Sequence, residues 1–275
     1  MIKLNNVCFK YNNGDEIFNN LNLEIQDGEI VSIIGKNGAG KSTLIKIIAG
    51  LLKPKSGEVL MDNIDIYDKK NFITIRKNIG MVFQNPDNQI LFNNVYDDLK
   101  FALDNLNIEE KDIKIKEALA KVDMSDFLQK DTFKLSLGQK QRINIASVIA
   151  INPKHIILDE ATAMIDPIGK DKIYNIIKNL SKENKTIIYV TNNINEILLS
   201  NKVLVVGNKT IKHIFNTNEL LKNVNLLEEL NIKIPDILNL AIMLKNNGIN
   251  IDTQNLNLES LVNSILSETK KWKTQ

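Results

Sequence analysis

Short, continuous runs of apolar residues recur along the chain, separated by longer segments with helical spacing. Runs of this length are typical of strands that are buried on both faces of a sheet. The five runs are residues 29–35 (EIVSIIG), 79–84 (IGMVFQ), 155–160 (HIILDE), 186–191 (TIIYVT) and 202–208 (KVLVVGN). Amphipathic helical patterns follow the run at residues 29–35. Others lie between the runs at 79–84 and 155–160, and between those at 155–160 and 186–191. Strands that alternate with helices predict an α/β fold with a largely parallel sheet.

The N-terminal part and the middle of the chain depart from this alternation. Residues 2–11 and 17–26 alternate apolar and polar positions, as antiparallel strands with one solvated face do. Between Gln84 and Ser136 the patterns are helical, with no strand among them. We therefore expect an antiparallel β subdomain at the front and a helical subdomain, at about residues 86–146, inserted in the sheet.

The C-terminal part changes character after about Lys212, where helices and turns replace the strands. Its clearest helical segment is residues 231–249 (NIKIPDILNLAIMLKNNGI). We therefore expect one large domain at residues 1–212 and a small C-terminal helical domain at residues 213–275.

Composition adds limits on compartment and partners. The chain has 275 residues, of which 43% are hydrophobic and 25% charged, a typical globular balance. Its net charge of +2 predicts no broad nucleic-acid surface. Cys8 is the single cysteine, so no intramolecular disulfide can form and a reducing compartment is expected. We see no signal peptide at the N-terminus and no apolar run long enough to span a membrane.

One glycine-rich segment carries the strongest chemical signal. GKNGAGKST matches the phosphate-loop pattern G-x-x-x-x-G-K-S/T between a predicted strand and a predicted helix, which is the context that the pattern requires. Glycines let backbone amides point at phosphates, the lysine adds a charge, and the serine can ligate Mg²⁺. The residues expected to bind nucleotide are Gly35, Lys36, Asn37, Gly38, Ala39, Gly40, Lys41, Ser42 and Thr43. The alternative is a glycine-rich turn with a lysine by chance.

Two acidic residues end the run HIILDE. Ligands of open α/β sheets bind at the carboxyl ends of strands, where Asp159 and Glu160 would lie. We expect Asp159 to hold Mg²⁺ and Glu160 to polarise an attacking water. The alternative is a buried strand that merely ends in solvated acidic side chains.

Five motifs together resemble the ATP-binding-cassette (ABC) ATPases. GKNGAGKST, VFQNPDNQI, LSLGQKQR, HIILDEATAMIDP and VTNNINEI occur in that family's order, from Tyr11 to about Lys212. GMVFQNPDNQI followed by NNVYDDLKFAL resembles the energy-coupling-factor (cobalt-type) transporter ATPases. EATAMIDP is similar to the first of that family's two paralogous ATPases. LNIKIPDILNLAIMLKNNGI is similar to its short C-terminal domain, which helps to pair the two.

The resemblance implies an ABC-type nucleotide-binding domain that uses ATP and Mg²⁺ to energise a membrane importer of vitamins or transition metals. It implies a second ABC ATPase as partner in a heterodimer, with two ATP molecules held between the subunits. It also implies a multi-span membrane coupling subunit, a substrate-binding membrane subunit and a peripheral place on the cytoplasmic face of the cell membrane.

Further residue roles follow from the resemblance alone. Tyr11 would stack on adenine, Gln84 would sense Mg²⁺ and the attacking water, and Asp166 would lie in the loop that crosses to the other subunit. Each has an ordinary alternative: a strand-end tyrosine packed on the sheet, a polar strand cap, and the N-cap of a helix that begins at Pro167. The signature that touches the partner's ATP would use Ser136, Gly138 and Gln139.

The signature departs from the family's LSGGQ at Leu137. Leucine does not readily adopt a positive φ, and its side chain would crowd a phosphate. The rest of the motif is present, with a capping-type helix start at Ser136, so we interpret it as a mildly altered signature rather than as an ordinary helix start.

A second departure is Asn192, which stands where the family has a histidine that donates to the γ-phosphate. The two histidines of the chain, His155 and His213, lie elsewhere, and we expect both to be structural or surface residues. Asparagine still donates but has a shorter reach and no charge. We therefore expect ATP binding to be retained and hydrolysis to be slow, with Asn192 as a catalytic position.

Three other functions stay open from the sequence. The chain could serve another class of ABC transporter, or act as a soluble ABC protein in DNA repair, translation or cluster assembly. Repair proteins need a long coiled-coil insertion and translation factors usually carry two cassettes, and neither feature is present. A regulatory subunit that binds ATP without turning it over is favoured by Asn192 and disfavoured by Glu160.

Overall fold

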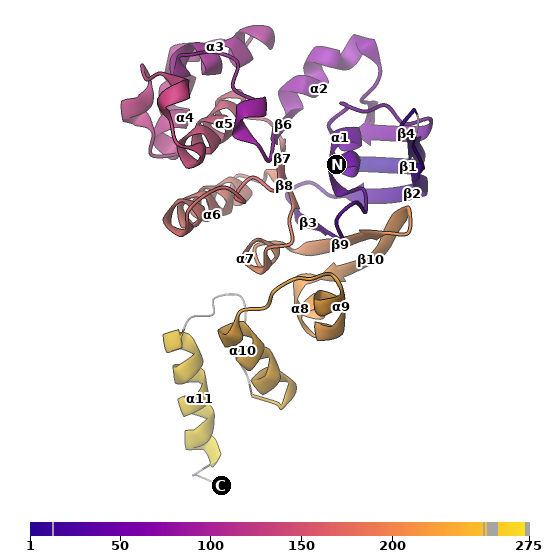
Figure 1. Ribbon diagram of the computed structural model, residues 1–275, viewed down its shortest axis with the longest axis vertical. Coiled ribbons are helices and arrows are strands. Elements are labelled where there is room, and N and C mark those ends of the chain that lie inside the picture. The colour runs from indigo at the N-terminus through magenta and orange to yellow at the C-terminus, as the bar shows by residue number, and fades with distance from the viewer. Residues whose placement is uncertain (13, 250, 252–257, 273–275) are drawn as a thin grey trace.

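A six-stranded sheet carries the loops that hold most of the expected site. In the computed structural model, which describes residues 1–12, 14–249, 251 and 258–272, its order is β10-β9-β3-β8-β7-β6 (Figure 1). The neighbours β9, β3, β8, β7 and β6 are parallel, and β10 runs antiparallel to β9. The strands are β3 (Ile30–Ile34), β6 (Ile79–Val82), β7 (His155–Asp159), β8 (Thr186–Val190), β9 (Lys202–Gly207) and β10 (Thr210–Asn216). Every residue of β3, β7 and β8 is buried, which explains their continuous apolar runs.

A second, antiparallel sheet has the order β2-β1-β4-β5. Its strands are β1 (Ile2–Lys10), β2 (Glu16–Ile25), β4 (Ser56–Met61) and β5 (Ile64–Asp65). Buried and exposed residues largely alternate along β1 and β2, because one face of the sheet covers a core and the other meets solvent. Apolar side chains of these strands share a core with α1 (Lys41–Ile48) and with β3.

The helices fall into groups with different positions. The helical subdomain contains α3 (Val95–Asn105), α4 (Lys111–Lys121) and α5 (Leu137–Ile151), which lie together in Figure 1. The helices α2 (Phe72–Asn78), α6 (Pro167–Lys182) and α7 (Ile194–Ile197) flank the six-stranded sheet in the same view. Short 3₁₀ turns cover Lys69–Asn71, Pro86–Asn88, Ser125–Phe127 and Thr132–Lys134. The α/β class and the antiparallel and helical parts predicted from the sequence are confirmed.

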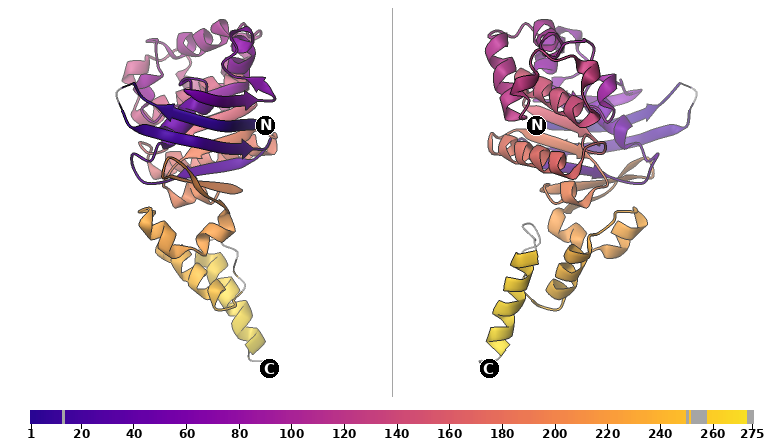
Figure 2. Two further views of the ribbon diagram at one scale, coloured as in Figure 1. Left: turned by 90° about the vertical axis from the view of Figure 1, so that its right-hand side faces the viewer. Right: turned by 60° about the vertical axis from the view of Figure 1, so that its left-hand side comes forward.

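The C-terminal part contains α8 (Thr217–Leu221), α9 (Val224–Glu229), α10 (Asp236–Asn246) and α11 (Leu258–Trp272). In Figure 2, α10 and α11 project away from the sheets. Buried residues of α8, α9 and α10 form one core with Val203 and Val205 of β9 and with Ile194 and Ile197 of α7. The helices α8, α9 and α10 are therefore anchored on the six-stranded sheet. No helix in the described part of the chain is long and apolar enough to cross a membrane.

The pattern analysis missed one strand of the large sheet. The expected change to helices after Lys212 falls inside β10, which pairs with β9 up to Asn216. Asn208 and Lys209 between the two strands both have positive φ, of 50° and 63°. Two such residues make the tight turn that suits a hairpin. Most of β10 is exposed or half-buried, so its apolar signal is weak.

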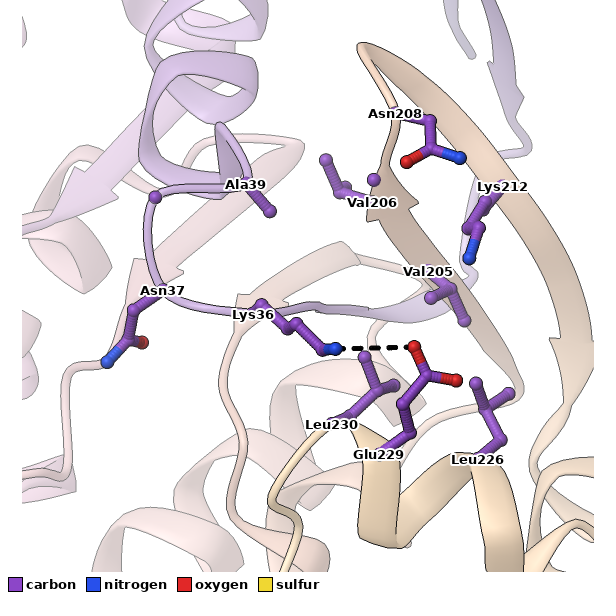
Figure 3. Close-up of a pocket in the computed structure, with 12 residues that line it drawn as sticks. Lys36, Asn37, Ala39, Val205, Val206, Asn208, Lys212, Leu226, Glu229 and Leu230 are labelled. Carbon is purple, nitrogen blue, oxygen red and sulfur yellow. Dashed lines mark ion pairs between the residues drawn. The ribbon is translucent and has the colours of Figure 1, made fainter.

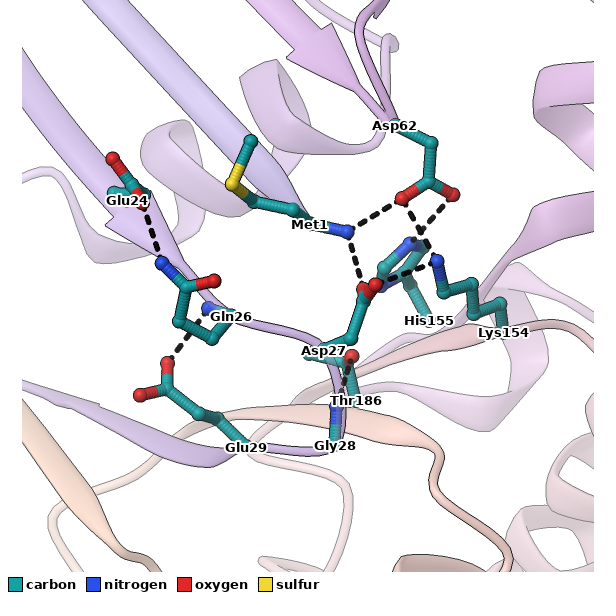
Figure 4. Close-up of polar contacts among 10 residues, drawn as sticks. All are labelled: Met1, Glu24, Gln26, Asp27, Gly28, Glu29, Asp62, Lys154, His155 and Thr186. Atoms are coloured by element: carbon teal, nitrogen blue, oxygen red, sulfur yellow. Dashed lines mark hydrogen bonds and ion pairs between the residues drawn. The ribbon is translucent and has the colours of Figure 1, made fainter.

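A cluster of charged residues connects the two sheets (Figure 4). Lys154 lies 2.8 Å from carboxylate oxygens of both Asp27 and Asp62, and the amino group of Met1 contacts the same two carboxylates. His155, the first residue of β7, is fully buried beside them, with Nε2 at 3.8 Å from Asp62. Neither of its ring nitrogens has a hydrogen-bond partner among the described residues. His155 is thus a structural residue, as expected, whereas His213 is exposed on β10.

Burial lowers the pKa of His155 to about 4, despite the nearby Asp62 carboxylate. The neutral imidazole is favoured in the folded state, so the unfolded chain binds more protons once the pH falls below the ordinary histidine value. The contribution of His155 to the unfolding free energy is fully present above pH ~6.5 and is lost progressively as the pH falls towards ~4.

We predict that replacing His155 flattens the acid dependence of folding. Between pH 7 and pH 5 the wild type should lose about 2 kcal/mol more of unfolding free energy than His155→Gln loses. Urea unfolding of both proteins at both pH values measures the difference. His213→Gln is the matched control, because that ring is exposed and should leave the dependence unchanged. Equal losses in wild type and His155→Gln would contradict the prediction.

Candidate functional site

The phosphate loop joins β3 to α1. Gly40, directly before α1, has a φ of 101°, and a Cβ there would lie 2.8 Å from Ile17 and 3.0 Å from Phe18. A Cβ on Gly35 would lie 2.6 Å from the backbone oxygen of Val206. Glycine is required at both positions for backbone shape and space. The loop therefore presents its amides and the N-terminus of α1 in the form of an anion site.

Two side chains converge on the first carbonyl of this loop. The Lys41 ammonium donates to Gly35 O at 2.8 Å and to Lys36 O at 3.2 Å. The Asn192 amide donates to the same Gly35 oxygen at 3.3 Å. Asn192 thus lies beside this chain's own phosphate loop. Its amide oxygen is buried without a hydrogen-bond partner among the described residues.

Lys41 is the cation of the site. It is 6% exposed, and burial lowers its pKa, while the carboxylates of Glu160 and Asp159 oppose that shift. The two carboxylates therefore favour the charged ammonium. A charged, partly desolvated lysine in a glycine-rich loop before α1 suits a polyphosphate.

Ser42 and Asp159 provide oxygen atoms suitable for a magnesium ion. Ser42 Oγ donates to Asp159 Oδ1 at 3.3 Å, although the two residues lie in α1 and β7. Burial raises the pKa of Asp159, and the Ser42 hydrogen bond counteracts it. A hydroxyl and a carboxylate in contact, beside a phosphate loop, fit the ligand preference of Mg²⁺.

Gln84 and Glu160 meet at the same edge of the sheet. Gln84 follows β6, Glu160 follows β7, and the Gln84 amide donates to Glu160 Oε2 at 2.7 Å. Glu160 has a φ of 46°, which is uncommon for a residue other than glycine, asparagine or aspartate. Such backbone strain clusters at functional sites. The contact joins the two side chains expected to orient an attacking water.

Tyr11 shows features of both of its expected roles. Its ring meets Phe9 edge-on with centroids 5.0 Å apart, and its hydroxyl lies 3.0 Å from Thr43 Oγ1 of the phosphate loop. The side chain is nevertheless 44% exposed. It therefore lies next to the phosphate loop with open ring surface.

The signature segment begins α5 with a capping box. Ser136 Oγ accepts from Gln139 N, and Gln139 Oε1 accepts from Ser136 N, as the capping-type pattern predicts. Leu137 is the first helical residue, without a positive φ, and its side chain is 43% exposed. The expected backbone strain at Leu137 is therefore wrong. Because the leucine adopts ordinary helical geometry, only its side chain distinguishes this signature.

Asp166 lies next to the signature. It caps α6, accepting from Gly169 N at 3.0 Å, just before Pro167. A Cβ on Gly138 would lie 3.9 Å from Asp166 Oδ2 and 3.8 Å from Ile165. The loop after Glu160 and the start of α5 are thus neighbours on one surface of this chain.

Comparison with known proteins identifies the family to which this chain belongs. The family model described as ABC transporter matches residues 18–163. The chain belongs to the ABC transporter family. A relative from Fusobacterium nucleatum, "Energy-coupling factor transporter ATP-binding protein EcfA1", is 39% identical over 95% of this chain and 97% of its own length. One of the same name from Mycoplasmopsis synoviae is 45% identical over 86% of this chain and 91% of its own length.

Solved structures agree with these relatives. The cbiO1 protein of Clostridium perfringens, part of the ABC transporter complex cbiONQ, is 34% identical with a TM-score of 0.73, covering 89% of this chain and 98% of its own. The cassette MJ0796, a dimer in a post-hydrolysis state bound to ADP and Pi, is 31% identical with a TM-score of 0.72, covering 79% of this chain and 99% of its own. Within the ABC family, this chain belongs to the energy-coupling factor ATP-binding proteins, which are ATP-hydrolysing subunits.

Two features of this ABC ATPase were not anticipated from its sequence. A hollow of about 390 Å³ beside Glu160 and Asn192 is lined by Lys170 and by the buried Glu196. Glu196 sits among apolar residues in a short helix, and nothing in the pattern marks it as part of the site.

The second feature lies on the outer side of the phosphate loop. The Lys36 side chain points to Glu229 of α9, at 3.3 Å, across a cavity of about 280 Å³ (Figure 3). Both side chains are more than half exposed, so this ion pair contributes little to stability. This ion pair nevertheless shows that α9 of the C-terminal part lies directly against the phosphate loop.

We predict that Asn192→His speeds ATP turnover. A histidine would restore a longer donor beside Gly35, and loss of one such donor typically costs about 10²–10³ in rate. The gain should appear in kcat, with ATP affinity changed little, and steady-state ATPase assays measure it.

Asn195→His is the matched control, because Asn195 is exposed on α7, three residues after Asn192. It should leave kcat unchanged. If Asn192→His has the wild-type rate or a lower one, then Asn192 does not limit hydrolysis.

Proposed function

We propose that this chain hydrolyses ATP with Mg²⁺ as one half of a heterodimer that energises a membrane importer from its cytoplasmic face. Each ATP would lie between the phosphate loop of one subunit and the signature of the other. The observation that carries the proposal is an apolar groove, described below, whose lining is hydrogen-bonded to the segment next to Gln84.

The chemistry assigned to this chain's residues follows from their positions. The amides of the phosphate loop and Lys41 would hold the β- and γ-phosphates, with Tyr11 beneath the adenine. Mg²⁺, held by Ser42 and Asp159 and sensed by Gln84, would supply positive charge where the phosphate oxygens gain negative charge. Glu160 would orient the attacking water while Gln84 holds its carboxylate in place. Asn192, which lies beside Gly35 of the loop, would donate to the γ-phosphate.

A heterodimer is favoured by the way the two departures are distributed. Asn192 lies beside this chain's own phosphate loop, and Leu137 projects from the signature at a surface shared with Asp166. With an intact second ATPase, each composite site would carry one altered element. Apolar side chains of α10 and α11 are exposed and would add a second contact with that ATPase, as the resemblance implies. They are Leu240, Met243, Val262 and Leu266.

The groove lies between the sheet and the helical subdomain. It has a volume of about 570 Å³ and is lined from α2, β6, α3 and α5. Phe72, Leu91 and Phe101 contribute exposed apolar surface to it. The groove is thus a largely apolar surface between β6 of the sheet and the helical subdomain.

The charged residues of the groove are already satisfied by the chain itself. The Arg76 guanidinium donates to Ala49 O at 2.7 Å and to Gly50 O at 3.1 Å. The buried Asp98 carboxylate accepts from the backbone of Leu91 at 2.7 Å and of Phe92 at 3.1 Å. The groove therefore suits a short apolar helix more than a charged ligand.

The backbone of Phe83 connects the groove to the ATP site. Gln89, which lines the groove, accepts from Phe83 N at 3.3 Å, and Gln141 of α5 donates to Phe83 O at 2.9 Å. Phe83 directly precedes Gln84. Movement of the signature helix on closure of the dimer would thus shift both Gln84 and the groove, and pass to a membrane helix docked there.

The first test is affinity purification of the tagged chain from gently solubilised native membranes. We expect a second cassette ATPase and a multi-span membrane protein to copurify, identified by mass spectrometry. Recovery of soluble proteins alone would refute the importer role and leave the ATPase chemistry intact.

A charge in the groove should break the membrane contact selectively. We predict that Phe101→Asp abolishes copurification of the membrane protein, because a carboxylate would be buried without a partner. ATP binding by the isolated chain should stay unchanged. Ile113→Asp is the control, since Ile113 is exposed on α4 and does not line the groove. Loss of the membrane protein from both variants, or from neither, would argue against docking in this groove.

A further inference from the structure

Glu196 is a buried carboxylic acid that the roles above leave unused. It lies in α7, is 2% exposed, and accepts a hydrogen bond from the Thr162 hydroxyl. The Thr191 hydroxyl also hydrogen-bonds to its carboxylate. Thr162 and Thr191 are each 3% exposed, so this three-residue contact, the Glu196 bridge, is almost entirely buried.

The Glu196 bridge joins the two segments that carry the reacting side chains. Thr162 lies two residues after Glu160, and Thr191 directly precedes Asn192. The strands before these segments, β7 and β8, are paired up to Asp159 and Val190. The last backbone bond between the two segments runs from Glu160 N to Val190 O, at 3.0 Å. Beyond it, the Glu196 bridge continues the connection through side chains.

Further contacts hold the bridge rigid on the Asn192 side. The Thr191 hydroxyl accepts from Asn193 N at 2.9 Å, which leaves its proton for Glu196. The Asn193 amide donates to the Tyr174 hydroxyl at 3.3 Å, which ties the segment to α6. The Thr191 hydroxyl is therefore directed towards Glu196.

Burying a carboxyl group is costly, and the neighbours of Glu196 offset this cost only in part. Burial raises the pKa of Glu196, while Thr162, Thr191 and the charge of Lys170 lower it and the charge of Glu160 raises it. An apolar residue would fill the same space without that cost. An apolar residue, however, could not hydrogen-bond to both threonines, and it is this polar contact that Glu196 supplies.

We propose that Glu196 is a positioning residue for ATP hydrolysis: it fixes the spacing of the segments after β7 and β8, so that Glu160 and Asn192 face the γ-phosphate together. The hollow of about 390 Å³ lined by all three residues is the space whose shape the bridge sets. The inference rests on the ATPase activity and does not depend on the identity of the membrane partner.

The test compares Glu196→Ala with Glu196→Gln in the full chain, purified with its ATPase partner where one copurifies and alone otherwise. Alanine removes both acceptors and should lower kcat by about 10²-fold, since small misplacements in a reacting site cost that much. ATP affinity should stay within about threefold, because the phosphate loop is untouched. Melting temperatures identify any variant that fails to fold.

Glutamine should rescue most of the activity. Its amide can accept from one threonine and donate to the other, because hydroxyls do both. We expect kcat of Glu196→Gln within about fivefold of wild type. Glu117→Ala, at an exposed glutamate of α4, is the matched control and should behave as wild type.

Thr162→Val gives an independent variant on the other side of the bridge. If both residues act through one contact, the double variant Glu196→Ala/Thr162→Val should be no slower than the slower single variant. Three outcomes would overturn the proposal: unchanged kcat in Glu196→Ala, equal losses in the alanine and glutamine variants, or fully additive losses in the double variant.

Discussion

The parallel register of β3, β8, β7 and β6 is the constraint on which the rest of the site depends. Ile33 pairs with Val190, Asp159 with Val190, and Val82 with Leu158, so four strands end at one edge of the sheet. The phosphate loop, Asn192, Glu160 and Gln84 all follow those ends. Continuous apolar runs bury the strands, and the polar residues directly after them are brought together where the paired strands end.

Much of this arrangement could be predicted because it depends on local signals. The phosphate loop is one contiguous motif, and its glycines are required by the backbone and by close neighbours such as Val206 O. The capping box at Ser136 and the N-cap at Asp166 are short-range patterns with defined hydrogen bonds. The buried strands were recognisable because they have no solvated face.

The parts that were missed have weak local signals or depend on contacts between distant segments. β10 has little buried surface, so its pairing with β9 is visible mainly in the turn residues Asn208 and Lys209. Glu196 gains its significance from Thr162, which is distant in sequence and reaches it only through the packing of β7 against β8. At Leu137 the concern about φ was wrong because that residue is already the first of a helix.

Hydrogen bonds at the same edge of the sheet also connect the helical subdomain to the site. Glu160 is held by Gln84, and the segment before Gln84 is held through Phe83 by Gln89 in the groove and by Gln141 in the signature helix. These links cross subdomain boundaries, whereas those of Glu196 connect two segments at the end of the sheet itself. If a dimer closes as proposed, a shift of the helical subdomain would move Gln84 through these links, while the contacts of Glu196 would keep the spacing of Glu160 and Asn192.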